Sequence, residues 1–443
     1  MKPKLLFLTS DSSNPTISNL IDELKISFDV LIISDAKDST IDSSTFFYFK
    51  YKYKFFEKFL LLFSKQIDSR QEILFSKRNV YRKYKRLLDI ASTFKHLINR
   101  FINLPYYSDI TFFLFKNFNK FDNILNNCDA VLTDANFRHT FYLNPLIARC
   151  KKIKKPIYSI VLSWDNPQYS TLNRFSSKYF VWNEINKKEM QKYYGIDSKK
   201  FIISGSLIHD YLLENKEFLS KNLDNQKVSE KQNLRIMYAG VFPETDTKMI
   251  NEEINFVISL SKMIEDIYPD SKLIFRTYPS RGGKNVYSKL ENVSHIQIYR
   301  HEKFHTVSRL GNDLESISFN SDEKKKISEF FDTDLLISSG STYTLEYAFS
   351  KKPILHLHAE SLMKERNNHF NFFQRLYVYG HLDHLSPENF EENLIYNFDD
   401  LKRKLKSLQN LKESGYSEYL MQFCNSGISS SSKGIIRKNI KYD

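Results

Sequence analysis

The chain has 443 residues, more than one ordinary domain holds, so two or three domains are expected. Its residues are 41% hydrophobic and 26% charged, a composition that excludes a disordered chain. With only 11 Gly and 11 Pro, long flexible linkers rich in these residues are excluded as well. The net charge is +13, but no nucleic-acid recognition module accompanies it, so nucleic acid is not the favoured partner.

The first apolar run, Leu5–Thr9, is too short for a signal peptide and is predicted to be a β-strand. No stretch reaches the ~20 apolar residues that span a bilayer. The three cysteines, Cys128, Cys150 and Cys424, are far apart and form no metal-binding spacing, so we expect free thiols in a reducing compartment. These features predict a cytoplasmic protein.

The first half of the chain alternates strands and helices. The helix at Pro15–Ile26 shows the pattern most clearly, with apolar residues at helical spacing. The other expected elements are strands at Val30–Ser34, Ala130–Thr133, Ile157–Leu162, Tyr179–Trp182 and Phe201–Ser204, and helices at Leu146–Lys151 and Asn186–Tyr194. Strands that alternate with helices predict a parallel sheet covered on both faces.

Residues 44–105 interrupt this alternation with a basic, aromatic segment that is expected to be helical. It contains fourteen Lys/Arg and four Asp/Glu, a local net charge of +10, together with many Phe and Tyr. Lysines mixed with bulky apolar residues suit the anionic inner face of the cytoplasmic membrane. The alternative is a compositional bias, since the whole chain is rich in Lys, Asn, Ile, Phe and Tyr.

A second alternating series begins after a polar stretch. Its expected strands are Arg235–Tyr238, Lys272–Arg276, Ile296–Tyr299, Leu335–Ser338 and Pro353–Leu357, and its expected helices include Glu253–Tyr268, Ile327–Phe331 and Tyr343–Phe349. We therefore predict two Rossmann-like parallel-sheet domains facing across a cleft, at 1–212 and 234–420, with a linker at 213–233 and a polar tail at 421–443. In such sheets ligands bind outside the carboxyl ends of the strands.

The strongest local signal is a buried strand that runs through a Gly/Ser turn into a helix. Backbone N–H groups and hydroxyls at Ser339, Gly340, Ser341 and Thr342 would suit a phosphate, and Glu346 lies one turn into the helix, where a carboxylate could accept from a ribose. Ordinary capping of the helix by Ser and Thr explains the same residues.

Two further strand-end loops add candidates for the same ligand. Arg276 could pair with phosphate oxygens, and Tyr278 follows it in the loop. Gly240 ends the first strand of the second domain and would allow a close approach by a phosphate. A solvated surface loop is the alternative for the arginine.

The strand ends of the first domain offer groups for proton transfer. A general base has to be a carboxylate or histidine near the attacked hydroxyl. The candidates are Asp11 after the first strand, Asp134 and His139 in one loop, and Asp165 in the loop with Trp164 and Asn166, where Trp164 would be a platform for a sugar and Asn166 a binding group. Each of the aspartates has a turn or cap role as its alternative.

Several signatures are absent from the sequence. It contains no GxGxxG after its first strand and no GxxxxGK[ST], so dinucleotide and P-loop sites are excluded. Asp332-Thr333-Asp334 has the letters of a metal-binding motif, but it directly precedes a predicted buried strand and is better explained as a turn. We expect no metal and no cofactor.

The segments taken together resemble a known family. Its motifs are Ser163–Asn166, Tyr179–Glu184, Tyr194–Ile196, Ile203–Ser206, Ala239-Gly240, Arg276–Pro279 and Ser338–Glu346. They resemble those of bacterial surface-polysaccharide glycosyltransferases with the two-Rossmann (GT-B) fold. Relatives by architecture include CDP-glycerol glycerophosphotransferases, CMP-ulosonate transferases and UDP-N-acetylglucosamine 2-epimerases. The resemblance covers residues 155–360, and the first 40 residues are compatible with it.

The resemblance implies roles for individual residues. The Ser/Thr-rich turn at Ser339–Thr342 would hold the donor phosphates, and Glu346 would contact the ribose. The loop that often reads Arg-x-His-Pro in such enzymes has Tyr278 in place of His, so this position can donate a hydrogen bond but carries no charge.

The implied function is transfer of a sugar from a nucleotide-sugar donor to a glycan or lipid-linked acceptor in surface polysaccharide biosynthesis. The alternatives are a 2-epimerase-like enzyme or polyol-phosphate transferase on the same fold, and a non-catalytic glycan- or lipid-binding assembly protein. The sugar, the nucleotide and the stereochemical outcome are left open by the sequence.

Overall fold

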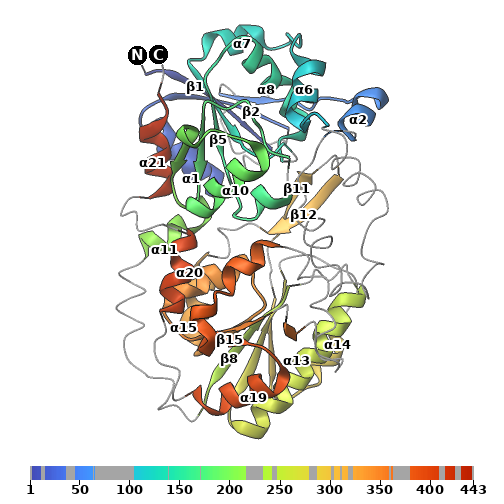
Figure 1. Ribbon diagram of the computed structural model, residues 1–443, viewed down its shortest axis with the longest axis vertical. Helices are drawn as coiled ribbons and strands as arrows, with labels where there is room; N and C mark the ends of the chain where they lie inside the picture. Colours follow the sequence, from blue (N-terminus) through green and yellow to red (C-terminus); the bar gives the residue numbers. More distant parts are fainter. Residues whose placement is uncertain are drawn as a thin grey trace.

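The computed structural model of the protein consists of two α/β domains, which lie one above the other in Figure 1. It describes residues 2–10, 15–35, 45–62, 64, 104–137, 139–169, 171–215, 233–241, 247–278, 287–300, 304–309, 312–317, 323–358, 361–362, 380–408, 415–424 and 431–441. Each domain is built on its own parallel sheet, one of seven and one of six strands. The predicted fold class, two Rossmann-like parallel-sheet domains, is confirmed.

The N-terminal sheet has the strand order β3-β2-β1-β4-β5-β6-β7, and neighbouring strands pair in parallel throughout. These strands are β1 (Lys4–Thr9), β2 (Asp29–Ser34), β3 (Phe46–Tyr48), β4 (Ala130–Asp134), β5 (Ile157–Ile160), β6 (Lys178–Val181) and β7 (Phe201–Ile203). All five residues of β4 are buried, and its first three are apolar, which is typical of strands covered on both faces.

Helices cover both faces of this sheet (Figure 1). They are α1 (Pro15–Lys25), α2 (Phe55–Leu62), α6 (Tyr107–Phe115), α7 (Asp122–Asn127), α8 (Asn144–Lys152), α9 (Asn166–Tyr169), α10 (Glu184–Tyr194) and α11 (Asp210–Glu214), with short 3₁₀ turns at Phe141–Leu143, Ser198–Lys200 and Leu207–His209. The helix α1 has the predicted apolar stripe: Ile17, Leu20, Ile21 and Leu24 are all buried.

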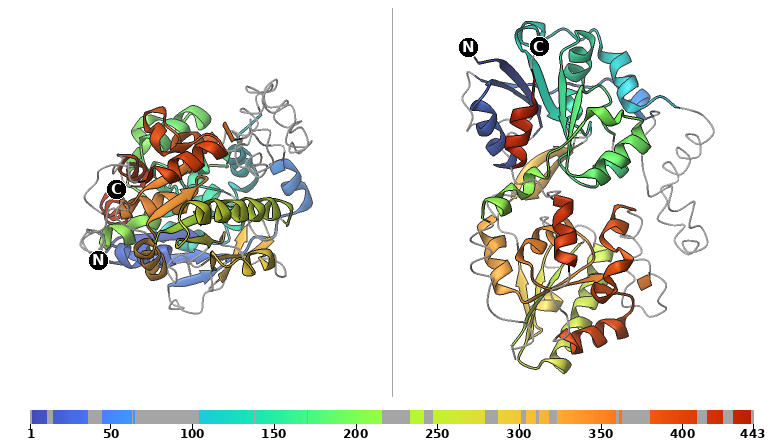
Figure 2. Two further views of the ribbon diagram at one scale, coloured as in Figure 1. Left: turned by 90° about the horizontal axis from the view of Figure 1, so that it is seen from below. Right: turned by 60° about the vertical axis from the view of Figure 1, so that its left-hand side comes forward.

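The end of the chain returns to the N-terminal domain. The predicted polar tail instead holds the end of α20 (Tyr416–Cys424) and helix α21 (Ser432–Asn439), and α21 packs against α1, as Figure 2 shows. Asp210 fixes the start of α21, because its carboxylate accepts from the backbone N–H groups of Ser432 and Lys433 at 2.8 and 3.0 Å. The tail therefore ties the two ends of the chain together.

Only part of the basic segment 44–105 lies within the described residues. Its first residues form the edge strand β3 rather than a helix, because they pair in parallel with β2. Helix α2 follows, and it packs against α6. Residues 65–103, like the predicted linker from residue 216 to 232, lie outside the described residues.

The C-terminal sheet has the order β10-β9-β8-β13-β14-β15, again with parallel pairing. Its strands are β8 (Arg235–Ala239), β9 (Lys272–Arg276), β10 (Ile296–Tyr299), β13 (Leu335–Ser338), β14 (Ile354–Leu357) and β15 (Leu394–Ile395). A separate antiparallel hairpin, β11 (Phe304–Arg309) with β12 (Asn312–Ile317), was not predicted. The helices are α13 (Thr247–Ile267), α14 (Ser288–Glu291), α15 (Glu323–Asp332), α16 (Thr342–Tyr347), α19 (Phe398–Lys406) and α20, with 3₁₀ helices η7 (Ala348–Ser350), η9 (Gly380–Leu385) and η10 (Glu388–Asn393).

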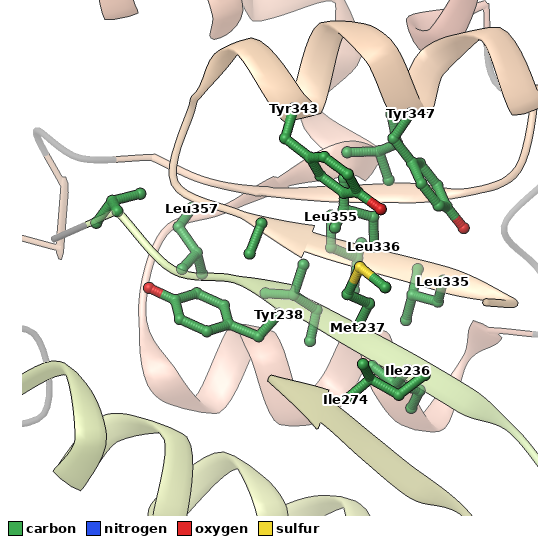
Figure 3. Close-up of a cluster of buried hydrophobic side chains, with 14 of the residues drawn as sticks. Ile236, Met237, Tyr238, Ile274, Leu335, Leu336, Tyr343, Tyr347, Leu355 and Leu357 are labelled. Carbon is green, nitrogen blue, oxygen red and sulfur yellow. The ribbon is translucent and has the colours of Figure 1, made fainter. Parts of the chain in front are cut away.

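The core of this domain lies between the sheet and its covering helices. Tyr343 and Tyr347 point from α16 onto the strands that carry Leu336 and Leu355 (Figure 3). Both rings contact that of Phe330 from α15, at centroid distances of 5.9 and 5.7 Å. Burial of these large rings fixes α16 directly above the end of β13.

The apolar core continues across the domain boundary. Trp164 and Trp182 of the N-terminal domain belong to the same cluster of buried side chains as the C-terminal core. Hydrogen bonds to the backbone of α20 join the domains there as well: Asn183 Nδ2 donates to Phe423 O at 3.0 Å, and Ser206 N donates to Cys424 O at 2.8 Å. The strand-end loops after β5, β6 and β7 thus contact α20. Within the residues that the structure describes, no helix is both long and apolar enough to cross a bilayer.

Candidate functional site

Each sheet contains one point at which the strand order reverses. In the N-terminal sheet it lies between β1 and β4, and in the C-terminal sheet between β8 and β13. The connections leaving the two strands at such a point run to opposite sides, which leaves a crevice at their carboxyl ends where ligands bind in open α/β sheets. In the sequence, the predicted residues Asp11, Asp134, His139, Gly240 and Ser339–Glu346 lie at or after the ends of these four strands. The remaining predicted residues lie at the ends of β5 and β9.

The turn after β13 is held by hydroxyl groups from within the turn. Ser338 Oγ accepts from Gly340 N at 3.1 Å and is hydrogen-bonded to Thr344 Oγ1, which in turn accepts from Ser341 N at 3.1 Å. Gly340 has φ +90°, a conformation in which a side chain would be strained. The N–H groups of Gly340 and Ser341 are therefore already paired inside the protein.

The hydroxyls at the start of α16 remain accessible. Ser341 and Thr342 are partly exposed, whereas Ser339 and Gly340 are buried. Glu346, predicted to contact a ribose, is 2% exposed, and its Oε1 accepts from Lys326 Nζ of α15 at 2.7 Å. Its carboxylate stabilises the contact between α15 and α16, and its role toward a ribose stays a prediction.

Arg276 is enclosed at the end of β9. Its Nε donates to Glu329 Oε2 of α15 at 2.7 Å, and its guanidinium lies 4.1 Å from the centre of the Tyr343 ring. The Tyr343 hydroxyl donates to the same carboxylate oxygen at 3.1 Å. Because Arg276 is only 4% exposed, it acts first as the internal partner of Glu329. Tyr278, two residues later, is 37% exposed and is the more accessible donor of this loop.

The loop after β8 is pinned by a buried carboxylate. Glu253 Oε1 of α13 accepts from Val241 N at 2.9 Å and from the Tyr238 hydroxyl at 2.8 Å. Burial, and then the charge of Glu253, raise the pKa of Tyr238 well above its ordinary value, so this tyrosine stays a donor. Gly240 is required by packing, because a Cβ there would lie 2.9 Å from the Phe275 ring.

In the N-terminal domain the structure brings Asp134 and His139 together. Asp134 Oδ2 lies 2.5 Å from His139 Nδ1, and Asp134 Oδ1 accepts from Asn136 N at 2.8 Å. Asn136 Nδ2 lies 3.2 Å from His139 Nε2. With this amide donating to Nε2, Nδ1 carries the proton and donates it to Asp134. A buried carboxylate thus holds the orientation and tautomer of an imidazole, as a general base requires. Asp11, on the neighbouring strand end, lies outside the described residues.

The loop after β5 places its three predicted residues differently. Asp165 is partly buried and accepts from Ser163 Oγ at 2.5 Å. Asn166 is 3% exposed, with no hydrogen-bond partner for Nδ2 among the described residues. Trp164 was predicted to be a sugar platform, but its ring is 4% exposed and meets Phe423 of α20 edge-on, so no ring face is offered to a sugar.

A polar cluster at the domain boundary was missed by the sequence analysis. Glu189 Oε1 of α10 accepts from Gln168 Nε2 at 2.5 Å and lies 2.9 Å from His384 Nε2 of η9. The backbone of η9 is fixed to α20, since the Tyr419 hydroxyl donates to His384 O. The sequence did contain one indication of this cluster. Glu189 lies on the same face of α10 as the buried residues Met190 and Tyr194, and a buried charge needs a partner.

We expect Glu189→Ala to destabilise the protein by about 1–3 kcal/mol, because it leaves the buried Gln168 amide and His384 without their acceptor. The adjacent Lys188 is exposed and serves as the matched control on the same helix: Lys188→Ala should change the free energy of unfolding by less than about 0.5 kcal/mol. Urea denaturation measures both, and equal effects would show that the cluster contributes nothing.

The cysteines offer no reactive group. Cys128, Cys150 and Cys424 are free and buried. Burial raises the pKa of Cys150 to about 12 and that of Cys128 to about 11, so these thiols stay protonated and are poor nucleophiles. Among the described residues, no group of three or more His, Cys, Asp or Glu side chains could hold a metal ion. A reaction without metal stays a prediction.

Comparison with known proteins gives structural matches only. No family model and no curated protein matches the chain. Similar solved structures include UDP-GlcNAc 2-epimerase from Neisseria meningitidis bound to UDP-GlcNAc, at 14% identity over 99% of both chains with a TM-score of 0.45. The wall teichoic acid polymerase TagF matches at 11% identity over 99% of this chain and 88% of its own, with a TM-score of 0.43. A glycosyltransferase from Rickettsia africae matches at 12% identity over 99% and 97%, with a TM-score of 0.40. These are the kinds of protein that the resemblance named.

Proposed function

We propose that the chain is a nucleotide-sugar-dependent, metal-independent glycosyltransferase that acts on a glycan or lipid-linked acceptor in bacterial surface polysaccharide biosynthesis. One observation carries the proposal. The strand-order reversal of one sheet coincides with a carboxylate–imidazole pair, and that of the other sheet coincides with a Gly/Ser turn with accessible hydroxyls. A transfer reaction needs these two kinds of group, one to accept a proton and one to stabilise a leaving phosphate.

The two sets of groups have complementary tasks. The nucleotide phosphates bind at the end of β13, where Ser341, Thr342 and Tyr278 supply hydroxyl donors. The acceptor hydroxyl takes the place of the Asn136 amide at His139 Nε2. As its oxygen bonds to the anomeric carbon, its proton passes to Nε2, and the bond from that carbon to the phosphate oxygen breaks. Asp134 stabilises the imidazolium that forms.

The sharpest test of the donor site is a thermal-shift titration with UDP, CMP, GDP, CDP and their sugar conjugates. A ligand that binds only the folded protein raises its melting temperature with concentration. We expect one nucleotide to stabilise the wild type, and Thr342→Ala to require about 10- to 100-fold more of it, because a hydrogen bond to a charged group is lost.

Ser288→Ala is the matched control, since Ser288 is the exposed first residue of α14 just as Thr342 is the first residue of α16. This variant should bind the nucleotide like the wild type. If no nucleotide stabilises the protein, the transferase proposal is wrong and a non-catalytic binding protein becomes the better explanation. Conversion of UDP-N-acetylglucosamine without any acceptor would instead identify a 2-epimerase.

A further inference from the structure

Four phenylalanines stand out on the surface of the N-terminal domain. Phe55, Phe56 and Phe59 of α2 are 85%, 63% and 44% exposed, and Phe113 of the adjoining helix α6 is 69% exposed. The rings of Phe55 and Phe59 stack at a centroid distance of 6.5 Å. Single exposed apolar residues are ordinary, but a group of aromatic rings on two packed helices marks an interaction surface.

The exposure of these rings is imposed by the way α2 is anchored. Tyr53, just before the helix, is buried; its hydroxyl donates to Phe141 O at 2.6 Å and its ring stacks on that of Phe141 at 4.4 Å. Glu57 accepts from the Tyr51 hydroxyl and from Lys54 N, and Leu61 packs into the core. With this face turned inward, the face that carries Phe55, Phe56 and Phe59 has to point outward.

Lysines lie on the same two segments as the exposed rings. Lys52, Lys54 and Lys58 are exposed on and beside α2, and Lys116 of the segment after α6 lies 5.7 Å from the centre of the Phe113 ring. Glu57, the acidic residue of α2, is already used by Tyr51 and Lys54. Among the described residues 50–62, four lysines therefore stand against one carboxylate, and the carboxylate of Asp109 in α6 pairs with Arg174 at 3.4 Å.

We propose that α2 and α6 form a docking surface for an anionic lipid bilayer, with the four phenylalanines inserted at the interface and the lysines against the headgroups. The charge argues for a bilayer over a protein partner, because the cores of protein interfaces are depleted of lysine. Phe113 extends the surface beyond the predicted segment 44–105. The inference does not depend on which reaction the protein catalyses.

The test is co-sedimentation of the full chain with phosphatidylcholine vesicles, with and without about one third phosphatidylglycerol. We expect binding to the anionic vesicles only. The triple variant Phe55→Ser/Phe56→Ser/Phe113→Ser should lower the partition coefficient at least about tenfold. Lys52→Gln/Lys54→Gln/Lys58→Gln should lower it by about fivefold per lysine and reduce its dependence on phosphatidylglycerol.

Ile26→Ser is the matched control, because Ile26 is 57% exposed just after α1, outside the proposed surface, and should not affect binding. Thermal unfolding of each variant shows that the fold is kept. Binding that is absent, or that the phenylalanine variant retains in full, would overturn the proposal. A second outcome would also overturn it: neither protein binds vesicles, and sedimentation velocity shows that the wild type self-associates while the phenylalanine variant is monomeric. The rings would then join two copies of the chain.

Discussion

Replacing Glu329 with alanine is expected to lower the free energy of unfolding by about 3–5 kcal/mol. The side chains of Arg276 and Glu329 are 5% and 3% exposed, so the variant would leave a guanidinium buried without its carboxylate. The Tyr343 hydroxyl would lose its acceptor as well. Because Arg276 ends β9 and Tyr343 lies in α16, the loss would also loosen the loops at the proposed donor site.

The control for this prediction lies on the surface of the same domain. Glu291 pairs with Arg300 at 2.6 Å, but both side chains are nearly half exposed, so Glu291→Ala should cost less than about 1 kcal/mol. The double variant Arg276→Met/Glu329→Leu should recover most of the loss, because apolar residues of similar size need no partner. Urea denaturation gives all three values. A Glu329→Ala variant no less stable than Glu291→Ala would contradict the buried pair.

The strands and their order of appearance could be predicted because the signal is local. Buried strands such as β4 and β13 are short apolar runs that end in polar turns, and the stripe of α1 repeats at helical spacing. The edge strand β3 was missed because a three-residue aromatic strand has no period of its own. It is defined by its pairing with β2, which the sequence does not display.

The partners of the site residues were out of reach for a different reason. Arg276 and Glu346 were predicted to contact a nucleotide, and that role stays a prediction, whereas their internal partners Glu329 and Lys326 lie 53 and 20 residues away in the sequence. The two partners are three positions apart in α15 and so lie on one face of it, yet only the packed domain shows that this face turns inward. The burial of Trp164 could not be predicted for the same reason, since its ring is covered by Phe423 from the other domain.

His139→Ala is expected to lower kcat of the transfer reaction by about 100- to 10,000-fold, the usual contribution of a positioned general base. The melting-temperature shift by the donor nucleotide should remain, because His139 lies in the other domain. Asp134→Asn should also slow the reaction, since an amide can keep the contact with Nδ1 but cannot stabilise the imidazolium with a charge. Both are measured as nucleotide release with saturating donor and acceptor.

The competing base is Asp165, which is why Asp165→Asn is the decisive comparison. If the proton passes to His139, Asp165→Asn keeps most of the activity, because the carboxylate is already engaged by Ser163 Oγ. If Asp165→Asn instead loses most of the activity and His139→Ala stays active, the acceptor site would be at the end of β5 rather than at the end of β4. The β5 loop contacts α20 through Trp164, so the acceptor would then bind beside the domain boundary rather than at the strand-order reversal of the N-terminal sheet.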